Sequence, residues 1–359
     1  MTRLKGNTSA FMLFLMVFFI GIQLIIGIGI GVIQAAGITT AMFGTLWFAI
    51  AIQLASLLLP LFIWLAITGD SFKRHMPSQP LGGVNILLIV VFSIFVQPTM
   101  MLISAFFSLF FVNDAAEIFT HFAAQPWWLI MLAIAVTPGV VEELVFRGYI
   151  QSNQKSSAFW KIAVMNGFLF GLMHLSPHQF LYTFVLGVVF AYLVYFTRSI
   201  WAGILSHFIV NGSQVSLAHW ATGAADGMDA YAAEVTFAQT LYDSFVETDP
   251  EMAQRMYDWA YGITPEIIAI IGVGILVVIT LPIAVALFVA MRNHNIRRNA
   301  AMAVTNEPVD VAAEEVSAEI EEITMAEIAE NEEFRPVWSK VDWYLVGVVA
   351  IYVVFIVLI

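Results

Sequence analysis

The sequence predicts an all-α protein, a polytopic membrane bundle of about eight to nine transmembrane helices. Of its 359 residues, 60% are hydrophobic and 11% are charged, whereas soluble domains carry roughly 25% charged residues. Apolar runs recur along the chain at about the 20-residue length that spans a bilayer as a helix. Helices are expected because an unpaired backbone group in lipid costs several kcal/mol.

Hydropathy places nine candidate membrane segments along the chain, at residues 11–33, 43–68, 84–112, 127–150, 161–175, 179–197, 199–217, 263–291 and 343–359. The first is longer than the 7–15-residue core of a signal peptide, so it is expected to be an uncleaved membrane helix. With the N-terminus in the cytoplasm, Arg255 is the only cation in the outer loops. The positive-inside rule therefore favours a cytoplasmic N-terminus.

Composition divides the chain into six parts: N-terminal transmembrane helices (1–121), core helices with polar side chains (122–217), an acidic extracytoplasmic segment (218–262), a transmembrane helix (263–291), a charged cytoplasmic segment (292–342) and a C-terminal transmembrane helix (343–359). Most of the acid behind the net charge of −12 lies in the two hydrophilic segments, so the charge does not indicate a nucleic-acid partner. Segment 292–342 is interpreted as a solvated tail, with a regulatory role as the alternative. The chain has no cysteine, which excludes disulfides, thiolate nucleophiles and cysteine-ligated metals.

Charged side chains inside a bilayer are costly and are functional candidates. Glu142 and Glu143 are neighbours on a predicted helix and point about 100° apart, so they are not expected to face one pocket together. Glu143 and Arg147 have the i, i+4 spacing that favours an ion pair. We interpret this pair as positioning and Glu142 as the free, working carboxylate. The alternative is a helix-end salt bridge whose arginine reaches the interface.

Two histidines lie on later membrane segments. His174 is on an apolar helix, where a single histidine is more often a packing residue than a catalyst. Gly167 and Gly171, four residues apart, would let another helix approach closely. His207 and Asn211 share a helix face and could both hydrogen-bond to one group between them, although such residues also join helices to one another.

These polar groups are predicted to meet in one layer. Measured from the nearest cations expected at the inner surface, Glu142, His174 and His207 lie roughly 14–20 Å deep. Two mechanisms are open. Glu142 could take a proton from water held by His174, while His207 and Asn211 stabilise the oxyanion of an attacked amide. Alternatively, Glu142, His174 and His207 could bind a divalent metal such as zinc. The chain has no HExxH motif, so the metal-free mechanism is preferred and no cofactor is required in it.

Three short motifs resemble those of a known family. "EELVFR" fits EExxxR, "FGLMH" fits FxxxH and "HFIVN" fits HxxxN. Their order on successive membrane helices, within residues 125–215, is similar to that of the CPBP family. This family comprises the CAAX proteases and the bacteriocin-processing or immunity proteins, also called Abi proteins.

The resemblance implies an intramembrane endopeptidase with a cavity open to the membrane and the cytosol. It implies Glu142 as the water-activating base, Glu143 and Arg147 as its support, His174 as a water-holding residue, and His207 with Asn211 as oxyanion stabilisers. Members of the family are often labelled metalloproteases, although a glutamate mechanism without metal is also proposed for them.

Resemblance to bacterial members implies a bacterial cell membrane. The expected substrate is then a peptide or protein segment at the membrane, such as a bacteriocin precursor, rather than a prenylated protein. One alternative is a non-catalytic immunity or scaffold protein with the same fold. A proton-relaying transporter is disfavoured, because the sequence shows no paired interrupted helices in two matching halves.

Overall fold

The computed structural model describes residues 7–154, 158–225, 239–240, 242–261, 265–305 and 347–352. Within these ranges the regular structure is helical, and β pairing is limited to one bridge between Ser78 and Ser199. The predicted all-α class is confirmed. Six described helical stretches are long and apolar enough to cross a membrane: Thr8–Ala35, Leu46–Thr68, Gly83–Phe107, Trp127–Gln151, Pro177–Thr197 and Ile270–Met302. The predicted number of eight to nine is not confirmed.

The difference in number comes from three of the nine predicted segments. Helix α9 (Phe159–Met173) has only 15 residues. Helix α11 (Ile200–Ala225) has 26 residues but is not among the six, because polar residues interrupt its apolar sequence. For the last predicted segment, the structure describes only residues 347–352, which are helical.

Two helices continue past the edges that hydropathy gave them. Helix α11 runs to residue 225 rather than 217, and α14 (Pro265–Thr305) runs to 305 rather than 291. Hydropathy finds the apolar part of a helix, whereas the backbone stays helical through polar residues of good helix propensity. The division of the chain into six parts stays a prediction, and residues 226–238 and 306–346 lie outside the described residues.

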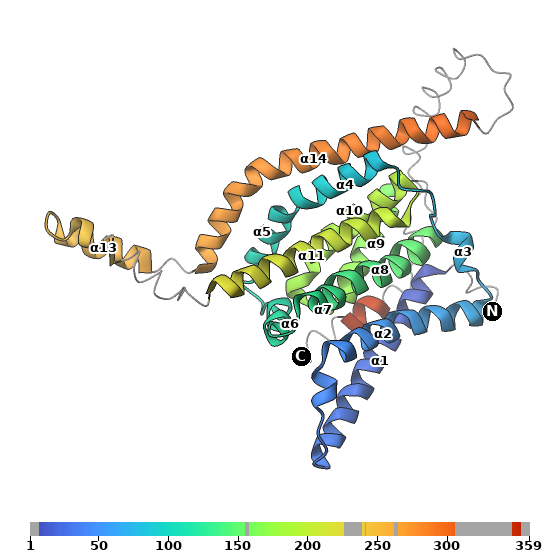
Figure 1. The fold of residues 1–359 in the computed structure, drawn as a ribbon, viewed down its shortest axis with the longest axis horizontal. Coiled ribbons are helices and arrows are strands. Elements are labelled where there is room, and N and C mark those ends of the chain that lie inside the picture. The colour runs from blue at the N-terminus through green and yellow to red at the C-terminus, as the bar shows by residue number, and fades with distance from the viewer. Residues whose placement is uncertain are drawn as a thin grey trace.

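The helices form successive layers (Figure 1). Helix α14 covers α4 (Gly83–Phe95) and α5 (Gln97–Phe107), which pack in turn against α10 (Pro177–Thr197) and α11. The continuous helix of α7 (Trp127–Met131), η2 (Leu132–Val136), α8 (Thr137–Glu143) and η3 (Leu144–Gln151) lies with α9 in the middle of the molecule.

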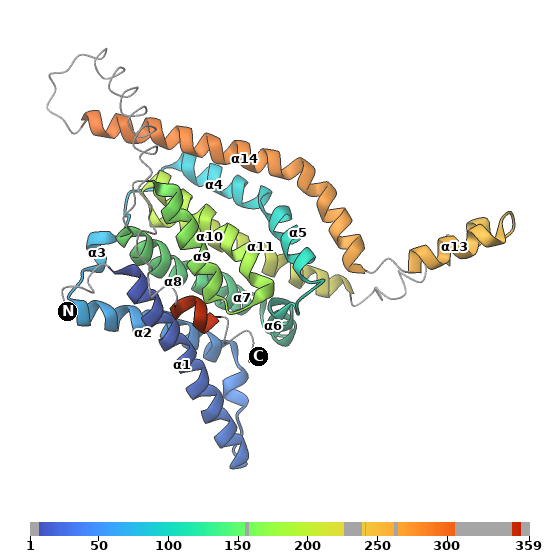
Figure 2. The same ribbon diagram turned by 180° about the vertical axis from the view of Figure 1, so that it is seen from behind.

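Helices α1 (Thr8–Ala35) and α2 (Leu46–Thr68) cover the opposite side of this central layer (Figure 2). Their apolar cluster also takes in residues 347–352, with Val348 fully buried. The short elements η1 (Ala41–Gly44), α3 (Phe72–His75) and α6 (Asp114–Phe122) connect the long helices, and α13 (Pro250–Tyr261) projects away from the bundle.

Polar residues at the helix ends fix where the long helices begin and stop. The side chains of Asn7, Thr45 and Ser176 accept hydrogen bonds from the first turns of α1, α2 and α10, which satisfies amide groups that have no partner inside the helix. Helix α2 ends at Gly69, whose φ of +64° is readily adopted only by glycine.

Glycines bring α9 and α10 into close contact. A Cβ atom on Gly167 would lie 2.6 Å from the Phe184 carbonyl oxygen, and one on Gly171 would lie 2.9 Å from that of Phe180. The predicted close approach of a second helix at Gly167 and Gly171 is confirmed. Gly187 meets Gly167 from the other side of the same contact.

A buried amide pair joins α14 to α4. The side chains of Asn85 and Asn295 donate to each other at 2.9 and 2.8 Å, and both residues are fully buried. Each amide supplies both a donor and an acceptor, so neither residue brings an unpaired polar group into the apolar cluster between these helices.

Candidate active site

The helix that carries the two carboxylates is irregular on both sides of them. Segments η2 and η3 are π-helical, and they flank the short α-helical segment α8 that ends at Glu143. Such π-turns occur frequently at functional sites. Pro138 stands at the junction of η2 and α8, and it has no N–H to donate to a carbonyl of the preceding turn.

Asn211 compensates for this missing donor. Its side-chain nitrogen donates to the Ile134 carbonyl at 3.0 Å, the group four residues before Pro138. Among the described residues Asn211 and His207 bind different partners, and their expected role as joint oxyanion stabilisers stays a prediction. Asn211 ties α11 to the helix that carries the carboxylates.

Glu143 and Arg147 form the predicted ion pair at the centre of the bundle. Arg147 Nη1 donates to Glu143 Oε1 at 2.8 Å, and both side chains are completely buried. Arg147 Nη2 donates to the Gly187 carbonyl at 3.0 Å, and the guanidinium lies over the ring of Phe170 at 4.6 Å. The interfacial salt bridge considered as the alternative is excluded, because no part of Arg147 reaches the surface.

His207 joins the two carboxylates across α8 and α11. Its Nδ1 lies 3.0 Å from Glu143 Oε1, and its Nε2 lies 3.9 Å from Glu142 Oε2. The imidazole ring stacks on Phe190, with 5.1 Å between the ring centroids. Because an ionised carboxylate only accepts hydrogen bonds, Nδ1 carries a proton and Nε2 faces Glu142.

Glu142 is the carboxylate that faces open space. Its side chain is 15% exposed, whereas that of Glu143 is fully buried. Its Oε2 has no hydrogen-bond partner among the described residues, and the 3.9 Å to His207 is too long for a direct bond. The predicted Glu143–Arg147 pair is present, whereas Glu142 makes no direct hydrogen bond through Oε2; both carboxylates approach the same imidazole.

His174 faces the same open space from a tight turn between α9 and α10. Its Nδ1 lies 2.9 Å from the Phe170 carbonyl, so this nitrogen donates and Nε2 is left as an acceptor. The next residue, Leu175, has a φ of +51°, a strained value for a side chain of this kind. This strain accompanies the sharp reversal that brings His174 to its position.

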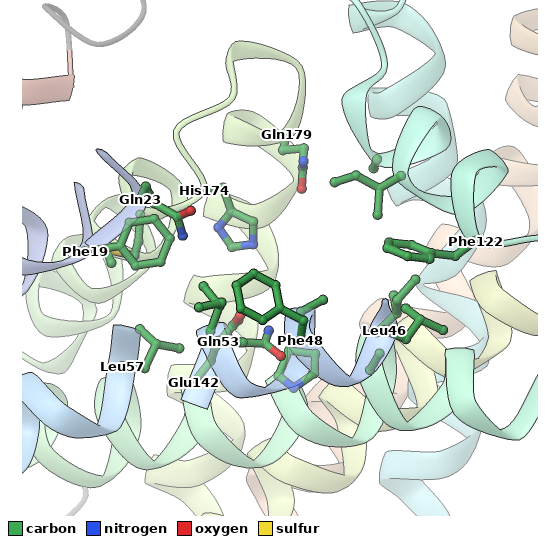
Figure 3. Close-up of a pocket in the computed structure, with 18 of the residues that line it drawn as sticks. Phe19, Gln23, Leu46, Phe48, Gln53, Leu57, Phe122, Glu142, His174 and Gln179 are labelled. Atoms are coloured by element: carbon green, nitrogen blue, oxygen red, sulfur yellow. The ribbon is translucent and has the colours of Figure 1, made fainter. Parts of the chain in front are cut away.

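Glu142 and His174 line one cavity of about 560 Å³ (Figure 3). Helices α1 and α2 form its opposite wall, and α6 contributes to a third side. Most of the lining is apolar, and the polar residues that line it are Gln23, Gln53, Glu142, His174 and Gln179. The cavity therefore places one free carboxylate and one imidazole at the edge of an apolar space.

The proposed metal ligands do not form a compact set. Among the described residues, no group of three histidine, aspartate or glutamate side chains is placed to hold a metal ion. Glu142 and His207 approach each other, but His207 is bonded to Glu143, and His174 reaches the cavity from another helix. The donors in this arrangement do not fit a three-ligand zinc site.

Reasoning from the sequence missed Gly203 and the glutamines of the cavity. A Cβ atom on Gly203 would collide with Glu143 Oε2, so this glycine makes room for the buried carboxylate. Its position one turn before His207 was a usable signal. Gln23 and Gln53 carried a signal as well, because each is an amide within a long apolar run.

Comparison with known proteins identifies one family. Residues 124–213 match the family model described as "Type II CAAX prenyl endopeptidase Rce1-like". The matched segment contains all six predicted site residues, Glu142, Glu143, Arg147, His174, His207 and Asn211. No curated protein and no solved structure matches the chain. The resemblance predicted from the three motifs is confirmed over this segment.

Proposed function

We propose that this chain, whose residues 124–213 are those of a CAAX-protease-like intramembrane peptidase, hydrolyses peptide bonds with a water molecule activated by Glu142. The observation that supports the proposal most directly is the position of Glu142. Its Oε2 makes no direct hydrogen bond among the described residues, and the carboxylate lies at the edge of an apolar cavity, 3.9 Å from the Nε2 of His207. A general base placed in this way contributes about 10²–10⁴-fold to the rate.

In the proposed reaction His207 acts as a hydrogen-bond donor at both ring nitrogens. It donates to Glu143 through Nδ1 and presents Nε2–H toward the reaction space beside Glu142.

The reaction follows from these assignments. Glu142 takes a proton from water, and the oxygen of that water attacks the carbonyl carbon of the substrate. The carbonyl oxygen becomes an oxyanion and accepts a hydrogen bond from His207 Nε2–H, a contribution typically of about 10²–10³-fold. When the C–N bond breaks, Glu142 returns its proton to the leaving nitrogen.

The remaining residues position these two groups. His174 Nε2, an acceptor that faces the cavity, accepts the second hydrogen of the attacking water. The Glu143–Arg147 pair holds the imidazole of His207 in place, and Asn211 fixes α11 by its bond to Ile134. Asn211 is thus a positioning residue rather than an oxyanion donor.

The test is cleavage by purified protein in liposomes, with a library of lipidated and unlipidated apolar peptides analysed by mass spectrometry. Glu142→Gln should lower kcat on the order of 10²-fold or more. Glu251→Gln, at an exposed carboxylate of α13, should leave kcat unchanged. Each protein is assayed with and without a chelator.

The outcomes separate the alternatives. Full activity of Glu142→Gln would overturn the proposed base. Loss of activity on chelation, with recovery on addition of zinc, would replace the metal-free step with a metal-dependent one. If no peptide is cleaved and Glu142→Gln keeps its cellular function, the chain is a non-catalytic immunity or scaffold protein. A bacterial membrane and a cytoplasmic N-terminus stay predictions.

A further inference from the structure

The wall of the cavity opposite Glu142 comes from helices outside the matched segment. Helices α1 and α2 contribute Gln23 and Gln53, whose side chains line the same cavity as Glu142 and His174. Figure 3 labels all four side chains around this cavity. Glu142 and His174 therefore share their cavity with two side-chain amides.

These two amides are not used to hold the protein together. No other residue in the described ranges is seen to hydrogen-bond with the side chain of Gln53 or of Gln23, although Gln53 is half-buried. Elsewhere in the bundle, amides have clear structural partners. Gln97, Gln151 and Asn166 donate to the main-chain carbonyls of Val210, Ala191 and Phe146, respectively.

An intramembrane peptidase has to meet the hydrogen-bonding needs of its substrate's main chain. A peptide bond is open to attack by water only where the substrate is not helical. In an apolar environment, every N–H and C=O group released by unwinding costs several kcal/mol unless it finds a partner. A glutamine side chain can donate to a C=O and accept from an N–H, as a neighbouring β-strand does.

We propose that Gln53, assisted by Gln23, binds the main chain of the substrate in an extended conformation beside Glu142. This inference rests on the proposed function and specifies its substrate as an apolar peptide segment recognised chiefly through its main chain. The apolar lining accommodates the substrate's side chains, through residues such as Phe19, Ile26, Phe48, Ile52, Leu57 and Phe122. Helices α1 and α2 thereby determine which segments enter.

The experiment measures peptide binding separately from cleavage. Full-length protein with Glu142→Gln is titrated in detergent with a short dye-labelled apolar peptide flanked by lysines. A series of analogues replaces one peptide bond at a time with an ester, which removes an N–H donor and weakens the C=O acceptor. Gln53→Leu is introduced into the same background.

A direct main-chain contact predicts a specific coupling. Gln53→Leu should raise the Kd of the parent peptide about tenfold, equivalent to about 1.4 kcal/mol. With Gln53 present, one ester analogue should have a Kd about tenfold higher than that of the parent peptide. In Gln53→Leu the same analogue and the parent peptide should have equal Kd values. Gln34→Leu is the control, because Gln34 is an amide of α1, the helix of Gln23, that donates to Thr40 and does not line the cavity.

Two further variants guard against misfolding of Gln53→Leu. Gln53→Asn keeps the amide but shortens its reach, and it should give an intermediate Kd. Gln23→Leu should couple to a different ester position. The inference is overturned if no ester position couples to either glutamine, or if no peptide of the series binds.

Cleavage of the parent peptide by the unsubstituted protein is measured in parallel. Coupled binding without cleavage would refute the proposed peptidase and retain a peptide-binding cavity. Cleavage without coupling would retain the peptidase and refute the role of the glutamines.

Discussion

Oε1 of Glu143 accepts hydrogen bonds from two groups, Arg147 Nη1 at 2.8 Å and His207 Nδ1 at 3.0 Å. One donor is on the same helix and the other is on α11, so this oxygen joins the two helices at the centre of the bundle. It also sets the orientation of the His207 ring, whose other nitrogen faces Glu142. In the proposed reaction, Glu143 therefore acts through His207.

Removal of the arginine should destabilise the whole protein. Arg147→Met leaves the fully buried Glu143 without its cation, and breaking one side of a buried ion pair typically costs about 3–5 kcal/mol. The free energy of unfolding, measured with denaturant in detergent micelles, should fall by this amount. Arg255→Met is the control, at an exposed arginine of α13, and should change it by less than about 0.5 kcal/mol. An unchanged midpoint for Arg147→Met would show that the pair is dispensable.

A single methyl group at Gly203 should disturb the site. The Cβ of Gly203→Ala would collide with Glu143 Oε2 and displace the carboxylate that orients His207. Misplacement of a catalytic group by about 1 Å costs on the order of 10²-fold in rate, so kcat should fall by about this factor. Gly274→Ala in α14, where a Cβ would contact nothing within 4 Å, should leave kcat intact. Equal kcat values for the two variants would contradict the predicted collision.

The bond from Asn211 to Ile134 should depend on Pro138. Asn211→Leu leaves the Ile134 carbonyl unpaired, which should cost about 1–3 kcal/mol of unfolding free energy. Pro138→Ala restores a main-chain N–H that can bond to the preceding turn. A double-mutant cycle should therefore show that Asn211→Leu costs less in the Pro138→Ala background. Strictly additive effects would mean that Asn211 does not compensate for the proline.

Replacing one residue of the amide pair between α4 and α14 should destabilise the protein more than replacing both. Asn85→Leu or Asn295→Leu alone leaves the other amide buried without its partner. Each single variant should lower the free energy of unfolding by about 1–3 kcal/mol. The double variant removes both polar groups and should recover much of that loss. Thermal unfolding of the three variants measures the coupling. A double variant as unstable as the sum of the two single variants would rule out a mutually satisfied pair.

Some of the site could be predicted because helix geometry fixes it locally. The spacing of Glu143 and Arg147 gave the ion pair, and the 100° turn per residue separated a paired Glu143 from a Glu142 that lines the cavity. The same reasoning could not place His207 between the two carboxylates. The direction of a side chain on one helix does not reveal which neighbouring helix it meets.

Other features depended on contacts between segments far apart in the chain. Asn211 was expected to act beside His207, and the sequence did not reveal that its side-chain amide donates to the Ile134 carbonyl on another helix. The predicted number of membrane-spanning helices is not confirmed, partly because hydropathy counts a short helix such as α9 in the same way as a long one. The sequence could not show that Gln53 lines the same cavity as Glu142, because this depends on how α2 packs against the helix of Glu142.

The Asn85–Asn295 pair also has a consequence for the order in which the protein is made. The two residues are 210 positions apart, and a ribosome adds about 5–20 residues per second. Asn85 is therefore synthesised roughly 10–40 s before Asn295. Its amide has no Asn295 to pair with during that interval, so docking of α14 follows the insertion of α4.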